Sequence, residues 1–485
     1  MLSEELVQLI QSLRQQKAES RTIEVKAAHD GCPQKLYGTL SSFSNQDSGG
    51  VILFGLDEAK EFAPVGVYDP QDLQKKVTEQ CQQMEPPVRA VFTFAEMDGL
   101  PVCAAEIPAV DLSERPCYYK GTGSLKGSFV RVGDADLPMT DYELYSYEAF
   151  RRRLHDDERP VERATLQMLD QNQLHRYLSQ KRFERPGFSQ LSEAQAYEML
   201  NITRGGALTL AAVMTFGLYP QGFFPQLAIT AVVVPGTRIG DVDAGRARFI
   251  DNKRIEGSLS AMAEEALAFC SRNMKVRTVV DAQTGERRDV PEYPLIAIRE
   301  AILNALIHRD YSLHTEGTPI QIDFFTDRLE IHSPGALYGR MTVEQLGQGR
   351  PDLRNSTLAV MAETLTQAEN HYSGIPTMRR EMAAMGLPEP VFENRRNEFV
   401  VTFYNRSRND RPVGVDELPD SAARLLEFCR IPRTRREIAD FLGIKTVFYV
   451  TQRYITPLLD ARLLAMTLPE TPKSRKQKFR AAVQR

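Results

Sequence analysis

Residues 295–308 constrain the fold of this chain more than any other segment. Their apolar side chains recur every three or four positions, the spacing of one buried face on an α-helix: Leu295, Ile298, Ile302, Ala305 and Leu306. Three polar side chains, Glu300, Asn304 and His308, recur every four positions and lie on or near another face. The pattern predicts a helix that buries one side in a core and turns a polar strip toward a cleft.

The polar strip has the residue types of a magnesium and phosphate site. An amide oxygen from Asn304, with phosphate oxygens and water, meets the octahedral oxygen coordination that Mg²⁺ requires. Glu300, one turn earlier, is placed to orient or deprotonate a water for attack on a terminal phosphate. A second interpretation stays open from these residues alone, in which they only cap and hydrogen-bond neighbouring turns.

The length and composition predict a multidomain α+β protein. At 485 residues the chain is expected to divide into about three or four domains. Its 42% hydrophobic and 26% charged residues are typical of a folded protein. The expected strands and turns predict an α+β domain over 1–140 and a middle α+β connecting domain over 141–290. A third domain, over 291–405, contains the helix predicted at 295–308. A polar linker at 406–420 and a basic domain at 421–485 follow.

Several features favour a soluble, cytoplasmic protein that does not enter a membrane. Residues 1–16 have the pattern of an amphipathic helix and not of a signal peptide. The most apolar stretch, 208–220, is too short to span a bilayer. The six cysteines include no Cys-x-x-Cys pair, which suits a reducing compartment. The Walker motif of helicase motors is absent from the sequence.

Four motifs follow in order through the third domain. They are residues 293–312 (YPLIAIREAILNALIHRDYS), residues 327–335 (DRLEIHSPG), Arg354-Asn355, and residues 373–382 (SGIPTMRREM). In this order they resemble the GHKL, or Bergerat-type, ATPases, in the branch of bacterial RecG-like proteins and transcriptional regulators. The resemblance implies an α/β sandwich that binds ATP with Mg²⁺.

The same resemblance implies roles for individual residues. Asn304 would hold the metal, Glu300 would activate water, Gly335 would line the base pocket and Gly374 would sit in the phosphate lid. The remaining nucleotide contacts predicted in this way are His308, Asp310, Ser333, Arg354 and Asn355. The chain departs from the family at Ser333, where many members have the aspartate that reads adenine, and at Tyr372, where the lid often has a second glycine.

The first domain carries a second set of motifs. Glu24-x-Lys26 is followed by SSFSN at 41–45, by Gly49-Gly50, and by Gly55 before Asp57. These residues resemble the AlbA_2 or Schlafen-type domain, which implies nucleic-acid binding. Lys26 and Lys35 are the predicted phosphate contacts. The alternative is that both are ordinary surface lysines.

Schlafen-type RNA nucleases add a catalytic alternative. In them, two glutamates five positions apart and a later acidic residue hold a divalent metal. Glu19, Glu24 and either Asp57 or Glu58 fall at comparable positions here. Clustered carboxylates of this kind could cut phosphodiesters.

The basic domain at 421–485 has fourteen Lys and Arg against five Asp and Glu, although the whole chain has a net charge of −4. Two short helices and a longer third, followed by a basic hairpin, resemble a winged helix-turn-helix domain. The DNA contacts that this predicts are Lys445, Thr446, Tyr449, Gln452 and Arg453 on the third helix, and Lys473, Arg475, Lys476 and Lys478 on the wing. A winged helix that contacts protein is the alternative.

Together these features predict an ATP-binding transcriptional regulator in which the nucleotide modulates DNA binding. The expected partners are DNA, with RNA as a possibility, and a second copy of the chain in a homo-oligomer. A metal-dependent nuclease of RNA or DNA is the second interpretation. The third is a nucleotide-dependent assembly factor. Weak ATP hydrolysis is compatible with the first and the third.

Overall fold

The computed structural model describes residues 1–16, 18–243, 245–280, 287–366, 374–405, 425–426, 428–442, 450–455, 458–459, 463–467 and 477–481. The chain divides into two compact units, Met1–Asn405 and Arg406–Arg485. Six of the predicted DNA contacts lie outside the described residues: Lys445, Thr446, Tyr449, Lys473, Arg475 and Lys476.

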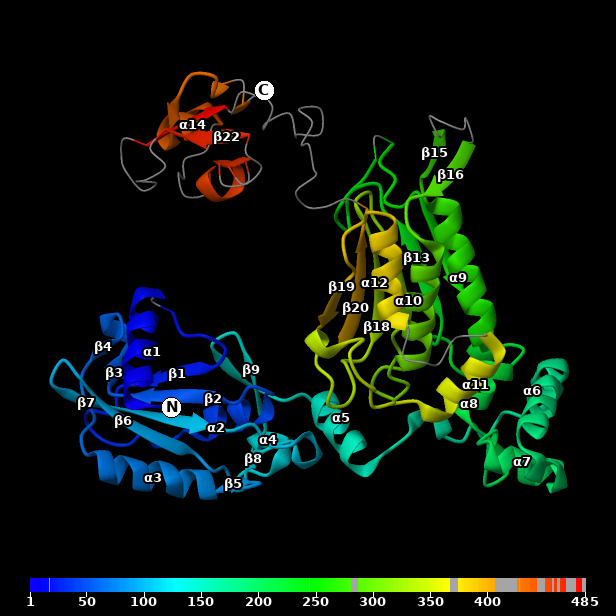
Figure 1. Cartoon of the computed structure of the whole chain (residues 1–485), viewed down its shortest axis with the longest axis horizontal. Helices are drawn as coiled ribbons and strands as arrows, with labels where there is room; N and C mark the ends of the chain where they lie inside the picture. Colours follow the sequence, from blue (N-terminus) through cyan, green and yellow to red (C-terminus); the bar gives the residue numbers. More distant parts are fainter. Residues whose placement is uncertain are drawn as a thin grey trace. The chain divides into compact units, whose positions relative to one another are not determined.

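The first part of the larger unit is built on a four-stranded sheet in the order β1-β2-β7-β6. Its strands are β1 (Ile23–Lys26), β2 (Gly50–Phe54), β6 (Val91–Met97) and β7 (Leu100–Ile107). β1 and β2 are parallel, and the other pairs are antiparallel. Helix α1 (Ser3–Gln16) covers one face, and helices α2 (Tyr37–Asn45) and α3 (Pro70–Gln82) cover the other (Figure 1).

The side chains of β2 alternate between the two faces of the sheet, which explains why each face packs in a core of its own. Leu53 packs with Leu6 and Ile10 of α1, whereas Ile52 and Phe54 pack with the α2 and α3 side. Successive strand residues point to opposite faces, so a strand that is apolar throughout must be covered on both. The smaller paired strands are β3 (Leu56–Asp57) with β4 (Ala63–Pro64), β5 (Met84–Glu85) with β8 (Tyr118–Tyr119), and β9 (Phe129–Val132) with β10 (Ala135–Pro138).

The second part of the larger unit contains a six-stranded sheet in the order β14-β13-β17-β18-β20-β19. Its strands are β13 (Ile229–Val233), β14 (Asp251–Ile255), β17 (Ile320–Phe324), β18 (Arg328–Pro334), β19 (Val391–Asn394) and β20 (Glu398–Tyr404). β13 runs parallel to β17, and the other pairs are antiparallel. The sheet therefore includes strands from both sides of the boundary expected at residue 290.

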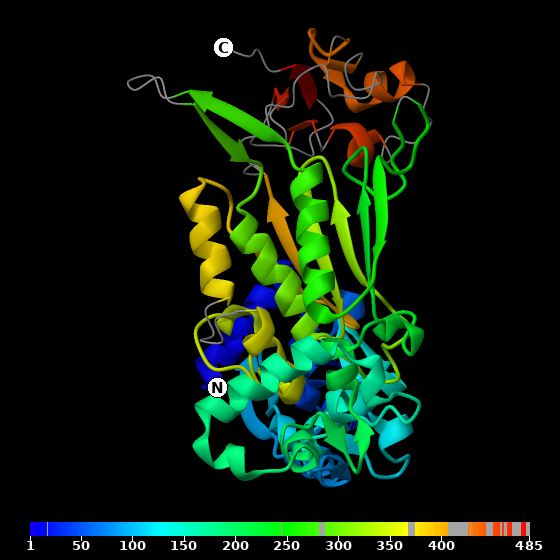
Figure 2. The ribbon, with the colours of Figure 1, turned by 90° about the vertical axis from the view of Figure 1, so that its right-hand side faces the viewer.

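Three helices lie side by side on one face of this sheet: α9 (Leu259–Asn273), α10 (Leu295–His308) and α12 (Gly374–Ala384) (Figures 1 and 2). Helix α10 has the bounds that the sequence predicted and buries Ile298, Ile302, Ala305 and Leu306. The prediction that Leu295 is buried was wrong. It is 37% exposed because it lies in the first turn, beyond the end of the buried stripe.

The remaining helices surround the end of this sheet. They are α5 (Asp141–Arg152), α6 (Gln171–Glu184), α7 (Glu193–Met199), α8 (Leu210–Phe216) and α11 (Ser356–Thr366). Two further strand pairs complete this part of the larger unit. They are the hairpin of β15 (Val276–Val280) and β16 (Arg287–Pro291), and the short pair of β11 (Thr203–Arg204) and β12 (Ala207–Leu208). All seven residues of α8 are buried, which explains the most apolar stretch of the sequence as a core helix.

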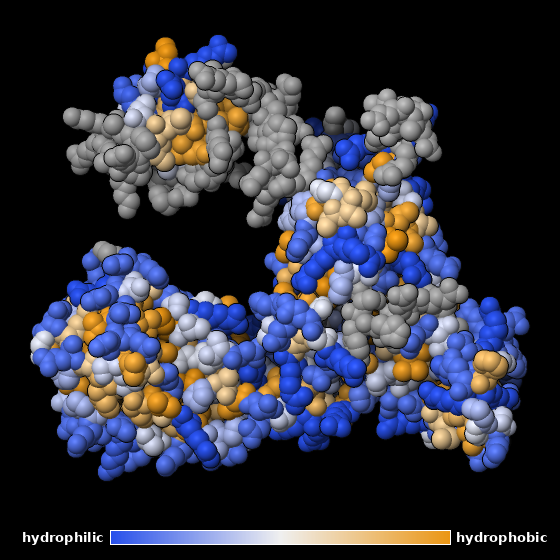
Figure 3. All heavy atoms as spheres, in the orientation of Figure 1, coloured by the Kyte–Doolittle hydropathy of each residue, from blue (hydrophilic) through white to orange (hydrophobic). Residues whose placement is uncertain are grey.

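Within the described ranges, every helix is too short or too polar to cross a bilayer. The face drawn in Figure 3 is mostly hydrophilic, with hydrophobic side chains in small groups.

The smaller unit contains a three-stranded antiparallel sheet in the order β21-β23-β22. Its strands are β21 (Arg433–Thr434), β22 (Leu464–Met466) and β23 (Lys478–Ala481), and α14 (Arg435–Phe441) follows β21. Thr434 caps α14 in a capping box with Glu437, as expected for a helix start of this sequence. The core of the smaller unit includes Leu425, Ile438 and Phe479.

The close approach of α2 to β2 gives a stability prediction. A Cβ added at Gly50 would lie 2.4 Å from the ring of Phe43, which is fully buried. We expect Gly50→Ala to lower the free energy of unfolding by about 1–3 kcal/mol, the usual cost of overpacking a core. Urea unfolding of the full chain, followed by circular dichroism, measures this.

The control is Gly187→Ala, because a Cβ at Gly187 meets nothing within 4 Å. Equal stability of the two variants would show that α2 moves away from β2 without cost.

Candidate functional site

A pocket of about 260 Å³ lies between helix α10 and the loop that follows β18. Three of its lining residues, Glu300, Asn304 and His308, come from the polar strip of α10. Further lining residues that the sequence predicted are Ser333, Gly335, Arg354 and Gly374. The structure therefore brings together seven of the nine predicted nucleotide contacts, from four separate segments.

The start of α12 closes one side of the pocket at Gly374. A Cβ at this position would lie 3.1 Å from both Asn304 Nδ2 and Glu300 Oε2. A glycine therefore lets the α12 backbone approach these two side chains. The first N–H groups of a helix have no partner within the helix and carry partial positive charge, so this end suits a phosphate. Asn304 offers an amide oxygen beside it, a ligand type that would suit a Mg²⁺ ion bound with a phosphate.

Gly335 also lines the pocket. It has φ of +102°, and a Cβ there would lie 2.4 Å from Arg354 Nη1 and 2.5 Å from Asp310 Cβ. Both the left-handed backbone and the lack of space therefore require glycine. The sequence predicted this residue in the pocket, and the contact with Arg354 and Asp310 is a result of the tertiary structure.

His308 lines the pocket and is an exposed residue, and desolvation lowers its pKa to about 4, which favours the neutral imidazole. The charge of Arg354 lowers the pKa further. A neutral imidazole offers one hydrogen-bond acceptor and one donor to a ligand in the pocket.

Asp310 and Asn355 lie behind the pocket wall and are absent from the pocket lining. Asp310 is buried and forms an ion pair with Arg354, whose Nη1 lies 3.1 Å from Asp310 Oδ2. Burial alone would raise the pKa of Asp310, but Arg354 holds it below the ordinary value. Nδ2 of Asn355 donates to the carbonyl oxygens of Ile307 at 2.8 Å and Arg309 at 2.7 Å. Both residues thus hold the end of α10 in place.

Ser333 is also directed at α10. Its Oγ donates to the carbonyl oxygen of Ala305 at 3.3 Å. The sequence prediction missed the apolar part of the lining, whose members include Tyr338, Met341, Ile375, Met378, Phe392 and Phe399. These residues come from one loop and three elements, and they share no spacing that a sequence pattern could reveal. An apolar wall beside a few polar groups is the usual composition of a ligand pocket.

In the first domain, Arg131 contacts Glu19 and Glu24, two of the four residues predicted for a nuclease, and also Asp136. This buried guanidinium lies 2.7 Å from Glu24 Oε2, 3.6 Å from Glu19 Oε2 and 3.0 Å from Asp136 Oδ1. Over the described ranges, the four predicted nuclease residues form no group of three potential ligand atoms within 4.8 Å. The arginine supplies the positive charge that a metal would otherwise bring.

The other predicted residues of the first domain lie near its surface. Asp57 caps a 3₁₀ turn by accepting from the Ala59 N–H at 3.0 Å, and its carboxylate pairs with Lys60 at 3.2 Å. Lys26 pairs with Glu24, and Lys35 is exposed. Glu58 lies close enough to Glu19 to raise its pKa.

In the smaller unit, Lys478 is exposed on β23. Gln452 and Arg453 fall in the π-helical segment Thr451–Ile455. The predicted contacts to DNA of this unit stay predictions.

Three family models match parts of the chain. Residues 19–140 match "Schlafen, AlbA_2", and residues 317–403 match "Putative ATP-dependent DNA helicase recG C-terminal", an ATPase-type domain. Residues 420–482 match "Filamentation induced by cAMP protein Fic-like, C-terminal domain". The first two confirm the AlbA_2 and RecG-like parts of the predicted resemblance, and they suggest nucleic-acid binding and ATP binding. The third was not predicted. Helix α10 lies outside the second match.

Two solved structures are similar to the chain. The DIP2311 protein from Corynebacterium diphtheriae is 20% identical, with 99% of this chain and 97% of that chain covered and a TM-score of 0.39. The N-terminal domain of an ATP-dependent DNA helicase RecG-related protein from Nitrosomonas europaea is 27% identical, with 27% and 92% covered and a TM-score of 0.23. A comparison with curated proteins found no match.

The carboxylates around Arg131 give a prediction with a defined pH dependence. Burial and the charge of Glu24 raise the pKa of Glu19 from 4.5 to about 7. The folded state then binds this proton more tightly than the unfolded state, so stability falls as pH rises from about 4.5 to about 7. Glu19→Gln removes this loss and keeps an oxygen to accept from the Val25 N–H.

We therefore expect Glu19→Gln to be more stable than the wild type at about pH 8, by on the order of 1–3 kcal/mol, and close to it at about pH 4. Urea unfolding at both pH values measures the difference, with exposed Glu96→Gln as the control. A variant that is less stable at the higher pH would contradict the raised pKa.

Proposed function

We propose that this protein is an ATP-binding transcriptional regulator that binds DNA, and that the nucleotide modulates DNA binding. The observation that carries the proposal is the pocket that joins Glu300, Asn304 and Gly374. It combines an amide oxygen for Mg²⁺, a helix N-terminus for phosphate and an apolar wall for a base. The matches to Schlafen, AlbA_2 and to the RecG C-terminal domain support nucleic-acid binding and ATP binding in one chain.

In this proposal Asn304 holds the Mg²⁺ ion and Gly374 keeps the α12 backbone close to the phosphates. Glu300 would orient a water molecule for slow hydrolysis of a bound nucleotide. Neutral His308 contributes a hydrogen bond without adding charge. Gly335 and the apolar lining take the base.

A continuous set of contacts links the pocket to the segment after the first domain. Arg354 lines the pocket and pairs with Asp310, and Asp310 accepts a hydrogen bond from the Tyr142 hydroxyl at 2.8 Å. Tyr142 belongs to α5, the helix that follows directly on the residues matched to Schlafen, AlbA_2. The next residue, Glu143, pairs with Arg396 at 2.8 Å in the turn between β19 and β20.

This set of contacts can transmit nucleotide binding. A ligand shifts a conformational equilibrium by the difference in its affinity for the two states. A phosphate or base that attracts Arg354 competes with Asp310 and so weakens the anchor of Tyr142. The arrangement of β21, α14, β22 and β23 supports a winged helix in the smaller unit, with exposed Lys478 on the wing as a DNA contact.

The nuclease interpretation stays an alternative, in which Arg131 already pairs with two of the predicted carboxylates, Glu19 and Glu24. The assembly factor likewise stays an alternative without specific support.

Nucleotide binding is tested by calorimetry with a non-hydrolysable ATP analogue. We expect Mg²⁺-dependent binding by the wild type and a loss of about ten- to a hundredfold in affinity for Asn304→Ala, because one contact to a charged group is removed. Asn252→Ala, an exposed asparagine on β14, is the matched control. No Mg²⁺-dependent binding by the wild type would refute the ATP proposal.

Coupling is tested with Tyr142→Phe. We expect this variant to bind the ATP analogue as the wild type does, while the analogue no longer changes its affinity for duplex DNA in fluorescence anisotropy. The reason is that only the hydrogen bond to Asp310 is removed. Tyr145→Phe is the control on the same helix, because its hydroxyl donates to Asp156 at 2.7 Å and not to Asp310.

If the analogue leaves wild-type DNA affinity unchanged, the regulatory part of the proposal fails. An absence of DNA binding even at low salt would remove its basis. Incubation with RNA and single-stranded DNA in Mn²⁺ buffer is the parallel test for cleavage.

A further inference from the structure

The face of the six-stranded sheet that points away from the helices carries three close polar side chains. β17 and β18 are antiparallel, with Asp323 directly opposite Glu330. His332 is two positions along β18 and therefore on the same face as Glu330. Their neighbours Ile322 and Ile331 point to the other face, where they pack in the helix-covered core.

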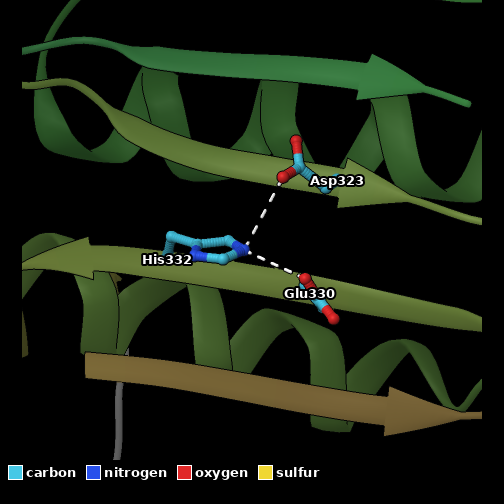
Figure 4. Close-up of side chains that lie close together, drawn as sticks. All are labelled: Asp323, Glu330 and His332. Carbon is cyan, nitrogen blue, oxygen red and sulfur yellow. Dashed lines mark hydrogen bonds and ion pairs between the residues drawn. The ribbon is translucent and has the colours of Figure 1, made fainter. Parts of the chain in front are cut away.

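The register brings the three side chains within reach of one ion (Figure 4). Nε2 of His332 lies 3.2 Å from Glu330 Oε2 and 3.6 Å from Asp323 Oδ2. One ligand atom from each residue lies within 4.8 Å of the others, and no second such group occurs in the described part of the chain. Ligands held at about 2.0–2.2 Å around a metal are about 3–3.5 Å apart. Small side-chain shifts would therefore complete the site.

Asp323 is the least satisfied member of the group. It is 9% exposed, and its carboxylate accepts no hydrogen bond from the described residues. Arg328 pairs with Glu330 at 2.6 Å, and the contact of Asp323 with a basic side chain is to Nε2 of His332 at 3.6 Å. A carboxylate that is buried without accepting a hydrogen bond is costly, and two carboxylates opposite each other across strands repel. Both costs fall when a cation lies between them.

The second ring nitrogen of His332 is held by another carboxylate. Nδ1 lies 3.1 Å from Glu398 Oε2, and Glu398 in turn pairs with Arg395 at 3.0 Å. Glu398 comes from β20, on the far side of β18 from Asp323. Histidine ligands of metals usually donate their other N–H to a carboxylate, which fixes the tautomer and orients the ring. His332 is thus oriented with Nε2 toward Asp323 and Glu330.

We propose that Asp323, Glu330 and Nε2 of His332 bind a divalent transition-metal ion, with Glu398 as a positioning residue. One imidazole and two carboxylates suit Zn²⁺ or Mn²⁺, whereas Mg²⁺ prefers oxygen ligands alone. Water would fill the remaining positions. The ion ties β17 to β18 on the face away from the nucleotide pocket, so this site is separate from the one proposed for Mg²⁺ and ATP.

The test is equilibrium dialysis of the metal-stripped full chain against Zn²⁺, with elemental analysis of the protein. We expect about one tightly bound Zn²⁺ per wild-type chain. His332→Gln and Asp323→Asn should lose it, because each removes one ligand. Glu398→Gln should keep it with an affinity about 10–100-fold lower, as for other partners of metal-binding histidines. Visible absorption bands of bound Co²⁺ provide a spectroscopic check.

The control is His175→Gln, an exposed histidine on α6, which should bind Zn²⁺ as the wild type does. Circular dichroism and binding of the ATP analogue report on folding and on the nucleotide site independently. Absence of tight Zn²⁺ in the wild type, equal binding by His332→Gln, or equal competition by Mg²⁺ would each overturn the proposal. If His332 is protonated and only bridges the carboxylates, the wild type will bind no Zn²⁺ tightly. If His332→Gln does not fold, Asp323→Asn and Glu398→Gln decide.

Discussion

Burial of helix α10 is the constraint on which the rest of the larger unit depends. Seven of its residues are buried against the sheet and the neighbouring helices: Ala297, Ile298, Ala301, Ile302, Leu303, Ala305 and Leu306. Each large side chain among them contributes on the order of 1.5–3 kcal/mol. With most of its surface in the core, the helix has one remaining strip, and that strip contains Glu300, Asn304 and His308. The position of the polar residues in a pocket is thus a consequence of packing.

The buried pair of Asp310 and Arg354 is the second determinant of the pocket. Two charges lose hydration when they are buried, and their attraction offsets this cost only when geometry is good and other hydrogen bonds are made. Here Tyr142, the Ser312 N–H and the Ala336 carbonyl complete the network. Removal of either charge would leave the other uncompensated. The pair therefore fixes Gly335 against its neighbours and connects α5 to the pocket wall.

The two faces of the six-stranded sheet illustrate how one set of strands can serve two purposes. Along β18, Leu329, Ile331 and Ser333 face the helices, while Glu330 and His332 face the other way. A strand of alternating character places an apolar core on one side and a charged cluster on the other, a few ångströms apart and separated by the backbone. Function on either face can therefore change without disturbing the packing of the opposite one.

The sequence by itself determined the local elements and the strongest motifs. Periodicity fixed the bounds of α10, because this signal depends on neighbours within one element. The motifs also identified the two domains that the family models confirm. Tertiary structure alone decided that β13 and β14 join the sheet of β17 to β20, that Asp310 faces Arg354 instead of the pocket, and that Arg131 lies among Glu19 and Glu24. It also brought Asp323 to His332. Each of these contacts joins residues from different elements through strand order, register or burial, and none leaves a pattern within a single stretch of sequence.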